Sequence, residues 1–237
     1  MKRLVLVLLL FFIPFEILSQ VNSSDKEENG KTYFSEQIYR YYAKFKEKSN
    51  RAFVLGNREE ANFYYQQLVN KHLVGSFMDN FNADCFSSDQ CQIQDFKKPL
   101  ILFTYASWSV PTKGEIPAIN SMAKKYKDEV DFAVIFWDSK SDVRQASKAY
   151  NKHIQILYVD ELKTRDAYTV KMLKHSLGFP TIFVVGSNKK IIEIKRNFQN
   201  EIGIEDEVAV ENCLNEFKNL VESIQNFEEN LVTNSFD

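Results

Sequence analysis

The sequence has no strong excess of charge of either sign and few residues of the types that build metal sites. Lys and Arg number 30 and Asp and Glu 32, which gives a formal net charge of −2, and the 237 residues include only 3 His and 3 Cys. A nucleic-acid-binding or basic membrane-surface protein carries a clear positive excess, so neither class is expected. Hydrophobic residues make up 44% of the chain, more than a disordered chain carries, and we expect one main folded core.

The sequence also lacks an apolar run near its start that is long enough to span a bilayer. The run Leu4–Ile13 is followed by Pro14 and Glu16, and it is short of the roughly 20 residues that a spanning helix needs. Two basic residues precede it and a polar stretch follows, which is the layout of a cleaved secretory leader. We therefore predict a signal peptide at residues 1–19, a periplasmic or secreted location, and no stable membrane span after cleavage.

The few cysteines favour a structural disulfide over a metal site. Cys85 and Cys91 are close enough in sequence to close a small loop, and an oxidising compartment would favour that bond. Their spacing does not match a paired-thiolate zinc knuckle, and no histidine follows at a metal-site interval, so we expect no metal. Cys213 lies on one apolar face of a predicted helix, where a buried thiol that fills space is the simpler interpretation.

Residues 20–95 are predicted to form a flexible polar segment followed by a helical extension. Apolar residues recur at helical intervals from Phe34 to Phe45, and a second helix is predicted from Arg58 to Val74, between Gly56-Asn57 and Gly75. No second copy of this helix pair occurs at a fixed period, which argues against a helical solenoid. The Cys85–Cys91 loop is expected at the end of this extension.

Residues 96–227 have a different pattern, in which short apolar runs alternate with helical stretches. The turn Gly186-Ser187-Asn188-Lys189 between two short strands predicts a hairpin, and a long helix follows. The predicted strands are Leu100–Tyr105, Val130–Trp137, Ile154–Val159, Thr181–Val185 and Ile191–Lys195, and the predicted helices are Glu115–Lys127, Ser141–Tyr150, Asp166–Leu173 and Glu205–Asn226. This order implies an α/β fold with a mixed central sheet between helices, and residues 228–237 form a tail.

One segment after the first of these strands carries a recognisable pattern. Residues 108–117 read Trp-Ser-Val-Pro-Thr-Lys-Gly-Glu-Ile-Pro, and some seventy residues later the chain reads Gly178-Phe179-Pro180-Thr181. The first segment resembles the W-C-x-P-C-[KR]-x-E-x-P pattern of the TlpA/ResA-like extracytoplasmic branch of the thioredoxin superfamily, and the second resembles that family's cis-proline segment. The resemblance covers about residues 96–227. It implies a thioredoxin-like three-layer α/β/α sandwich, preceded here by the helical extension.

The chain departs from that family at the two positions where the redox chemistry takes place. Ser109 and Thr112 stand where the family has cysteines, and a hydroxyl cannot replace a thiolate in disulfide exchange. His153 and His175 have no triad-like partner near them in sequence, so a Ser109 hydrolase is not expected either. We therefore expect no catalytic residue and no cofactor, and a protein that is more simply a binding module than an enzyme.

The resemblance implies a binding groove beside the proline, where an extended segment of a partner protein or peptide pairs with the backbone. Trp108 would form an apolar wall, and the positive amino end of the helix that begins at Glu115 would lie near Thr112, where it could favour a carboxylate or another anion. The expected groove residues are Trp108, Ser109, Val110, Pro111, Thr112, Glu115, Phe179 and Pro180. Retention of these residues as scaffold alone is the competing interpretation, because a fold can persist after an activity is lost.

Two other functions stay open from the sequence. The chain could be a thiol-disulfide oxidoreductase that uses Cys85 and Cys91, or Cys213, in place of the usual pair; their distance from Trp108 and Pro180 would decide this. It could also be a structural component of an envelope assembly, which would be favoured if the N-terminal helices covered the groove. The sequence does not fix the partner or the oligomeric state.

Overall fold

The computed structural model describes residues 30–86, 91–109, 111–160, 163, 170–178, 180–196, 200–201 and 203–234. The chain divides into two compact units, Met1–Gly30 and Lys31–Asp237, and all the elements described below belong to the second. The predicted signal peptide and most of the polar segment after it lie outside the described residues. No helix among the described residues is long and apolar enough to cross a membrane.

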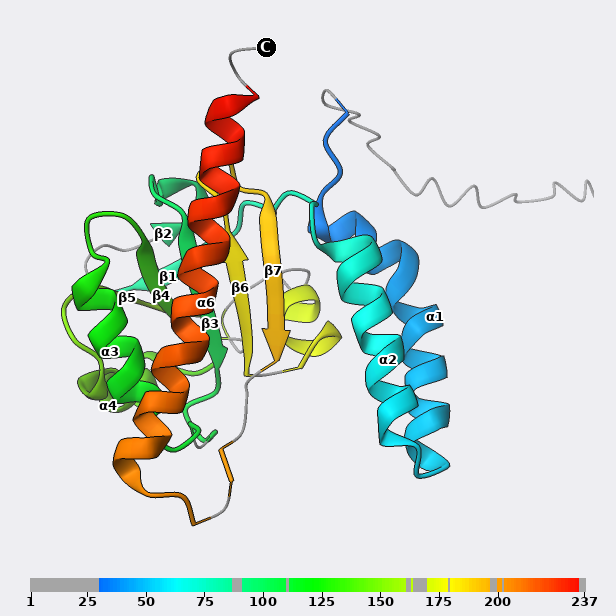
Figure 1. The fold of residues 1–237 in the computed structure, drawn as a ribbon, viewed down its shortest axis with the longest axis horizontal. Coiled ribbons are helices and arrows are strands. Elements are labelled where there is room, and N and C mark those ends of the chain that lie inside the picture. Colours follow the sequence, from blue (N-terminus) through cyan, green and yellow to red (C-terminus); the bar gives the residue numbers. More distant parts are fainter. Residues whose placement is uncertain are drawn as a thin grey trace, which may run out of the picture. The chain divides into compact units, whose positions relative to one another are not determined.

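A mixed sheet of seven strands, in the order β2-β1-β5-β4-β3-β6-β7, forms the centre of this unit (Figure 1). Its central strands β3 (Leu100–Tyr105), β4 (Asp131–Phe136) and β5 (Ile154–Tyr158) are parallel. Every residue of β3 is buried, which explains why its sequence is continuously apolar and does not alternate. The predicted hairpin is formed by β6 (Thr181–Val185) and β7 (Ile191–Arg196), and its strand β6 pairs antiparallel with β3.

Two short strands at the other edge of the sheet were not predicted. β1 (Asn82–Cys85) pairs antiparallel with β5, and β2 (Cys91–Gln92) pairs with β1. Both cysteines therefore lie in strands, whereas the sequence had placed them in a loop ahead of the sheet. Both strands are too short to show a period of two. The pairing of β1 depends on β5, about 70 residues away, which local sequence cannot reveal.

One face of the sheet is covered by three helices. They are α3 (Glu115–Lys125), α4 (Lys140–Ala146) and α6 (Asp206–Thr233), and α6 crosses the sheet beside α3 (Figure 1). The apolar side of α6 packs on the sheet through Ala209, Cys213, Phe217, Leu220, Val221 and Ile224. The helix continues to Thr233, so much of the region expected to be a C-terminal tail is helical.

The opposite face is covered by the N-terminal helices. α1 (Phe34–Val54) and α2 (Arg58–Leu68) form the predicted helical hairpin, and α2 continues into a π-helical turn at Val69–Leu73. A second π-helical segment, Val170–Ser176, lies on this face, and the predicted residues 166–169 of that helix lie outside the description. Side chains from these helices share one core with the sheet, as at Phe34, whose ring meets Phe183 of β6 edge to face. The extension is therefore integral to the folded unit.

Gly114, just before α3, lies against the backbone of α6. It precedes α3 with φ of +85°, a conformation that favours glycine. A Cβ atom at this position would lie 2.5 Å from the backbone carbon of Ala209 in α6. Since backbone atoms cannot move aside as a flexible side chain can, Gly114 is required both by its conformation and by the contact between α3 and α6.

We predict that Gly114→Ala lowers the free energy of unfolding by about 3 kcal/mol, because it adds a backbone clash to the cost of a left-handed residue. Gly56→Ala is the matched control: Gly56 has φ of +79° but nothing within 4 Å of its Cβ position, so only about 1 kcal/mol should be lost. Urea unfolding followed by circular dichroism measures both. Equal losses in the two variants would contradict the close-contact explanation.

Candidate functional site

The segment after β3 forms an exposed turn that carries the expected tryptophan. The Ser109 amide donates to the carbonyl of Ala106 at 2.9 Å, and the Ser107 amide donates to the Asp138 carboxylate at 2.6 Å. These bonds hold the turn against the end of β4. The Trp108 side chain is 72% exposed, which is unusual for so large an apolar group. The turn thus presents a fixed aromatic surface to solvent.

The proline segment lies directly across from this turn. Thr181 of β6 pairs with Thr104 of β3, and the Thr104 hydroxyl donates to the Thr181 carbonyl at 3.1 Å and accepts from its amide at 3.0 Å. This register places Pro180 beside the end of β3. The turn that carries Trp108 begins two residues after that end of β3. The two motifs, far apart in sequence, are therefore neighbours in the structure. Val110 and Phe179, also expected in the groove, lie outside the described residues.

Ser109 is not arranged as a nucleophile. Its hydroxyl oxygen is buried and makes no hydrogen bond to any described residue, so no described base is in position to activate it. His153 precedes β5, at the opposite end of the parallel strands from Trp108. The side chain of His175 lies outside the description. The described geometry gives no support to hydrolysis at Ser109.

Glu115 is a fully buried carboxylate that links the strand to the helix behind the turn. It accepts a hydrogen bond from the Tyr105 hydroxyl of β3 and another, at 2.8 Å, from the Thr112 amide. Burial, with the negative charge of Glu115 next, raises the pKa of Tyr105 well above its ordinary value, so this phenol stays protonated and donates. Glu115, in the first turn of α3, thus fixes the position of the loop that precedes the helix, and its negative charge is favourable at the amino end of a helix.

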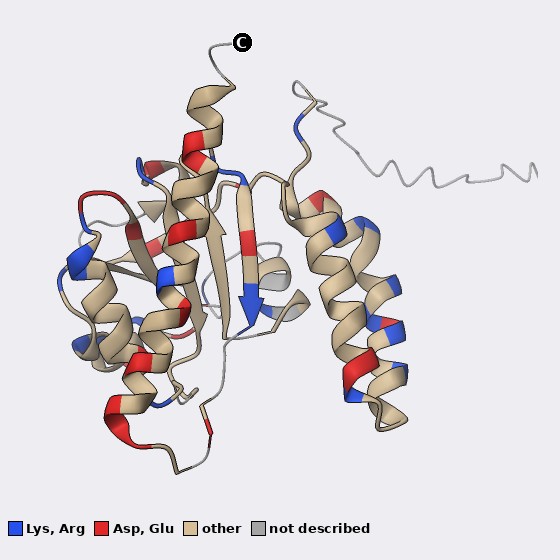
Figure 2. Cartoon of the chain, in the orientation of Figure 1, with Lys and Arg blue, Asp and Glu red and all other residues tan. Residues whose placement is uncertain are grey.

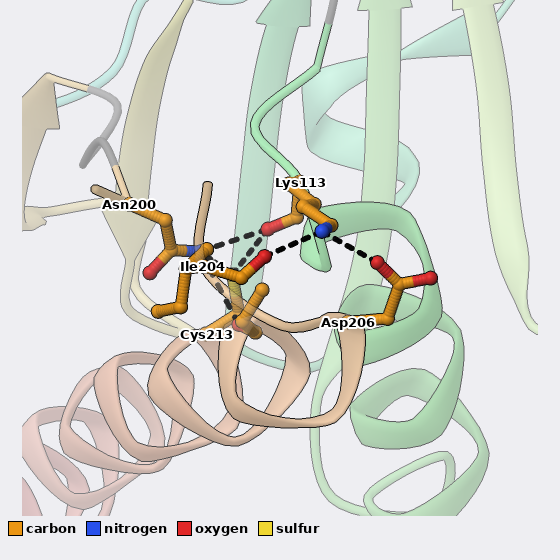
Figure 3. Close-up of polar contacts among 6 residues, drawn as sticks. Lys113, Asn200, Ile204, Asp206 and Cys213 are labelled. Atoms are coloured by element: carbon orange, nitrogen blue, oxygen red, sulfur yellow. Dashed lines mark hydrogen bonds and ion pairs between the residues drawn. The ribbon is translucent and has the colours of Figure 1, made fainter. Parts of the chain in front are cut away.

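A polar network joins the residue after Thr112 to the start of α6 (Figure 3). The Lys113 ammonium forms an ion pair with Asp206 at 2.6 Å and donates to the Ile204 carbonyl. The Asn200 amide donates to the Lys113 carbonyl at 2.8 Å and to the Cys213 sulfur at 3.6 Å. Asn200 was not predicted from the sequence, because it lies 87 positions from Lys113 and its segment has no local motif.

Cys213 contacts the backbone of Lys113, next to the redox position that Thr112 occupies, but it is unsuited to thiol exchange. It is 0% exposed, and its thiol donates to the Lys113 carbonyl at 3.7 Å. Burial is the largest cause, and the charge of Glu115 a smaller one, of a thiol pKa raised to about 11. Because the thiolate is the reactive form, the described surroundings of Cys213 make it an inert residue of the core.

The disulfide between Cys85 and Cys91 lies away from the groove. Cys85 aligns with Leu157 of β5, which aligns with Ile135 of β4 and then with Thr104 of β3. Three strand spacings separate Cys85 from β3, which amounts to about 14 Å. Cys85 is 3% exposed and Cys91 is partly exposed. The bond therefore links β1 to β2, three strands away from the strand that leads to Trp108.

Comparison with known protein families shows to which family the chain belongs. The AhpC/TSA family model matches residues 74–194, just over half of the chain, and the chain belongs to that family. Its α/β fold is thioredoxin-like, as the resemblance implied. No curated protein matches the chain in sequence.

Several solved structures are similar to this chain at low identity. The thioredoxin domain of a thiol-disulfide oxidoreductase from Bacteroides vulgatus is 16% identical, with a TM-score of 0.46, over 61% of this chain and 96% of that one. A thio-disulfide isomerase from Thermus thermophilus is 18% identical, with a TM-score of 0.46, over 63% and 96%. StoA from Bacillus subtilis is 20% identical, with a TM-score of 0.39, over 51% and 90%.

We predict that the thiol of Cys213 does not react with Ellman's reagent in the folded protein at pH 8. A pKa of about 11 leaves about a hundredfold less thiolate than an ordinary cysteine has, and burial blocks access to it. In 6 M guanidinium without reductant, one thiol per chain should react. Rapid labelling of the native protein would show that Cys213 is accessible and would reopen its candidacy for redox chemistry.

Proposed function

We propose that this protein is an exported thioredoxin-like binding module that holds an extended segment of a partner protein in the groove beside Pro180 without exchanging disulfides there. The observation that carries the proposal is the exposed Trp108 turn next to Pro180, on a scaffold with hydroxyl residues at both redox positions. An exposed aromatic side chain on a fixed turn is the type of anchor that contributes most to protein recognition.

The surroundings of the groove support binding over catalysis. The amino end of α3 would stabilise a thiolate at position 109 or 112, but an aliphatic hydroxyl stays protonated at neutral pH. Cys213, whose thiol contacts the Lys113 carbonyl, is fully buried. What the proposed groove retains is the exposed Trp108 on its turn, with Pro180 at the neighbouring start of β6, and an extended peptide could add there as a strand.

The N-terminal helices leave Trp108 uncovered, since its side chain is 72% exposed in the presence of α1 and α2. A purely structural role with a closed groove was the third function left open by the sequence. The exposure of Trp108 favours a groove that is open to a partner. An export signal at residues 1–19 stays part of the proposal, and it places this partner in the periplasm or outside the cell.

To test groove binding, peptides selected from a random display library on the purified protein serve as probes. We predict that Trp108→Ala weakens their affinity about tenfold or more, because truncating a tryptophan anchor removes a large apolar contact. Phe53→Ala is the matched control, since Phe53 is also an exposed aromatic residue, at 63%, but lies at the far end of α1. Affinity unaffected by Trp108→Ala would rule out the groove.

A second candidate function is thiol-disulfide exchange at Cys85 and Cys91. The observation in its favour is that the two cysteines form a disulfide and that Cys91 is partly exposed. Against it, Cys85 is buried in the sheet, the bond lies about 14 Å from β3, and no described helix begins at either residue to lower a thiol pKa. We therefore propose a structural role for this disulfide.

We predict that the protein does not accelerate insulin reduction by dithiothreitol and that a Cys85→Ser/Cys91→Ser variant behaves identically. A double variant, Ser109→Cys with Thr112→Cys, provides the matched positive control because it places thiols at the start of α3, where the helix end lowers a thiol pKa. Turnover by the natural sequence that disappears in the Cys85→Ser/Cys91→Ser variant would establish the second candidate and refute the structural role.

A further inference from the structure

A pocket of about 260 Å³ lies where the N-terminal helices meet the end of β7. Its floor is aromatic and apolar, with Tyr42 and Phe45 from α1 and Tyr65 from α2. Its rim carries two cations, Lys46 of α1 and Arg196 at the end of β7. Figure 2 shows basic residues along α1 and at the tip of β7. None of the lining residues is acidic, so the pocket has an unbalanced positive charge.

The two cations have no carboxylate partner among the described residues. Arg196 lies flat on the ring of Tyr65, with its guanidinium carbon 3.6 Å from the ring centroid. The Lys46 ammonium lies 5.1 Å from the centroid of the Tyr42 ring. Stacking uses the face of the guanidinium and leaves its edge donors in the fork geometry that matches a carboxylate. The aromatic rings therefore orient both cations without neutralising them.

A buried hydroxyl adds a second polar feature to the pocket. Tyr65 is 5% exposed, and its hydroxyl oxygen makes no hydrogen bond to any described residue. Buried hydroxyls in folded proteins normally have a partner, because an unpaired one costs about 1 to 3 kcal/mol. Burial raises the pKa of this phenol, so it stays a proton donor at neutral pH. An acceptor group bound in the pocket would supply the missing partner.

The pocket lies close to the groove proposed above. Gly178, two residues before Pro180, is one of its lining residues. Arg196 pairs with Thr181 across the β6–β7 ladder, so the end of β7 is directly beside the start of β6. An extended chain advances about 3.3 Å per residue, so a peptide held beside Pro180 reaches the pocket within a few residues.

We propose that this pocket binds the side-chain carboxylate of an aspartate or glutamate in the partner peptide, with Arg196 and Lys46 as its cationic contacts. The assignment rests on the proposed function, and it specifies the chemistry of the partner: an extended acidic segment. Specificity would come from the forked guanidinium, and the apolar floor would take the methylene groups of the acidic side chain.

The pocket is tested separately from the groove with a small probe, N-acetyl-glutamate N-methylamide, whose only charge is a side-chain carboxylate. In ¹⁵N-edited spectra of the full protein, we expect saturable shifts of the Arg196 Nε–H and Gly178 amide signals. The neutral glutamine analogue should cause none. A Lys46→Gln/Arg196→Gln variant should lose the shifts. Two controls should keep them: Arg51→Gln, which removes an arginine of α1 that does not line the pocket, and Trp108→Ala.

The display-selected peptides provide the second readout. With the natural protein, aspartate or glutamate should be enriched at one position, and replacing that residue by its amide should weaken binding about fivefold to tenfold. Arg196→Gln should abolish that difference, and circular dichroism of each variant verifies folding. Equal shifts with the glutamate and glutamine probes, or shifts that persist in the double variant, would overturn the carboxylate pocket.

The two proposals fail in different ways. Peptide binding that depends on Trp108 but shows no acidic preference would overturn the pocket and keep the groove. Binding of the small probe without any peptide binding would overturn the groove, and with it the assignment of the carboxylate to a peptide. Both readouts are compared in one buffer of low ionic strength, because salt screens exposed cations.

Discussion

The buried carboxylate of Glu115 holds together the end of β3 and the loop before α3, which is where the proposed groove lies. It accepts from the Tyr105 hydroxyl at the end of β3 and from the Thr112 amide before α3, so one side chain ties the last residue of a central strand to the start of a helix. Removing one partner of a buried charged hydrogen bond is far more costly than losing an exposed one. The loop between these points, with Trp108 exposed on it, is therefore held in a defined position.

The same constraint explains how the proposed groove keeps its framework with hydroxyl residues at positions 109 and 112. Lys113, Gly114 and Glu115 make structural contacts of their own: an ion pair with the start of α6, a close backbone approach to Ala209, and the bonds described above. None of these contacts involves a side chain at position 109 or 112. The framework therefore does not depend on the residues at positions 109 and 112, and the exposed Trp108 on it is the anchor of the proposed binding function.

The N-terminal helices contribute to both stability and recognition. Through Phe34 and its neighbours they complete the core on one face of the sheet, so they could not be removed without exposing that face to water. They also bring Lys46 beside Arg196, which belongs to a strand some 150 positions later in the chain. The extension thus contributes Lys46 and the aromatic residues of α1 and α2 to the pocket that also contains Arg196.

Much of the fold follows from local sequence. The apolar run at Leu100–Tyr105, the hairpin around Gly186 and the periodic face of α6 determine their elements because each buries enough apolar surface to be recognisable within a short window. The order of elements then predicts the mixed sheet, and the pattern from Trp108 to Pro117 predicts a groove at the end of its first central strand. The absence of sulfur at positions 109 and 112 is also a property of the sequence itself.

Other features were decided only by the tertiary structure. The pairing of β1 with β5, the placement of Cys213 under Lys113, and the meeting of Tyr65 with Arg196 all join residues that are far apart in the chain. Neither partner carries a local signal, since such contacts arise when the sheet and helices pack as whole units and bring together side chains that have no periodic relation. The sequence by itself determined the scaffold and its missing nucleophiles, and packing determined which charges and rings surround the groove.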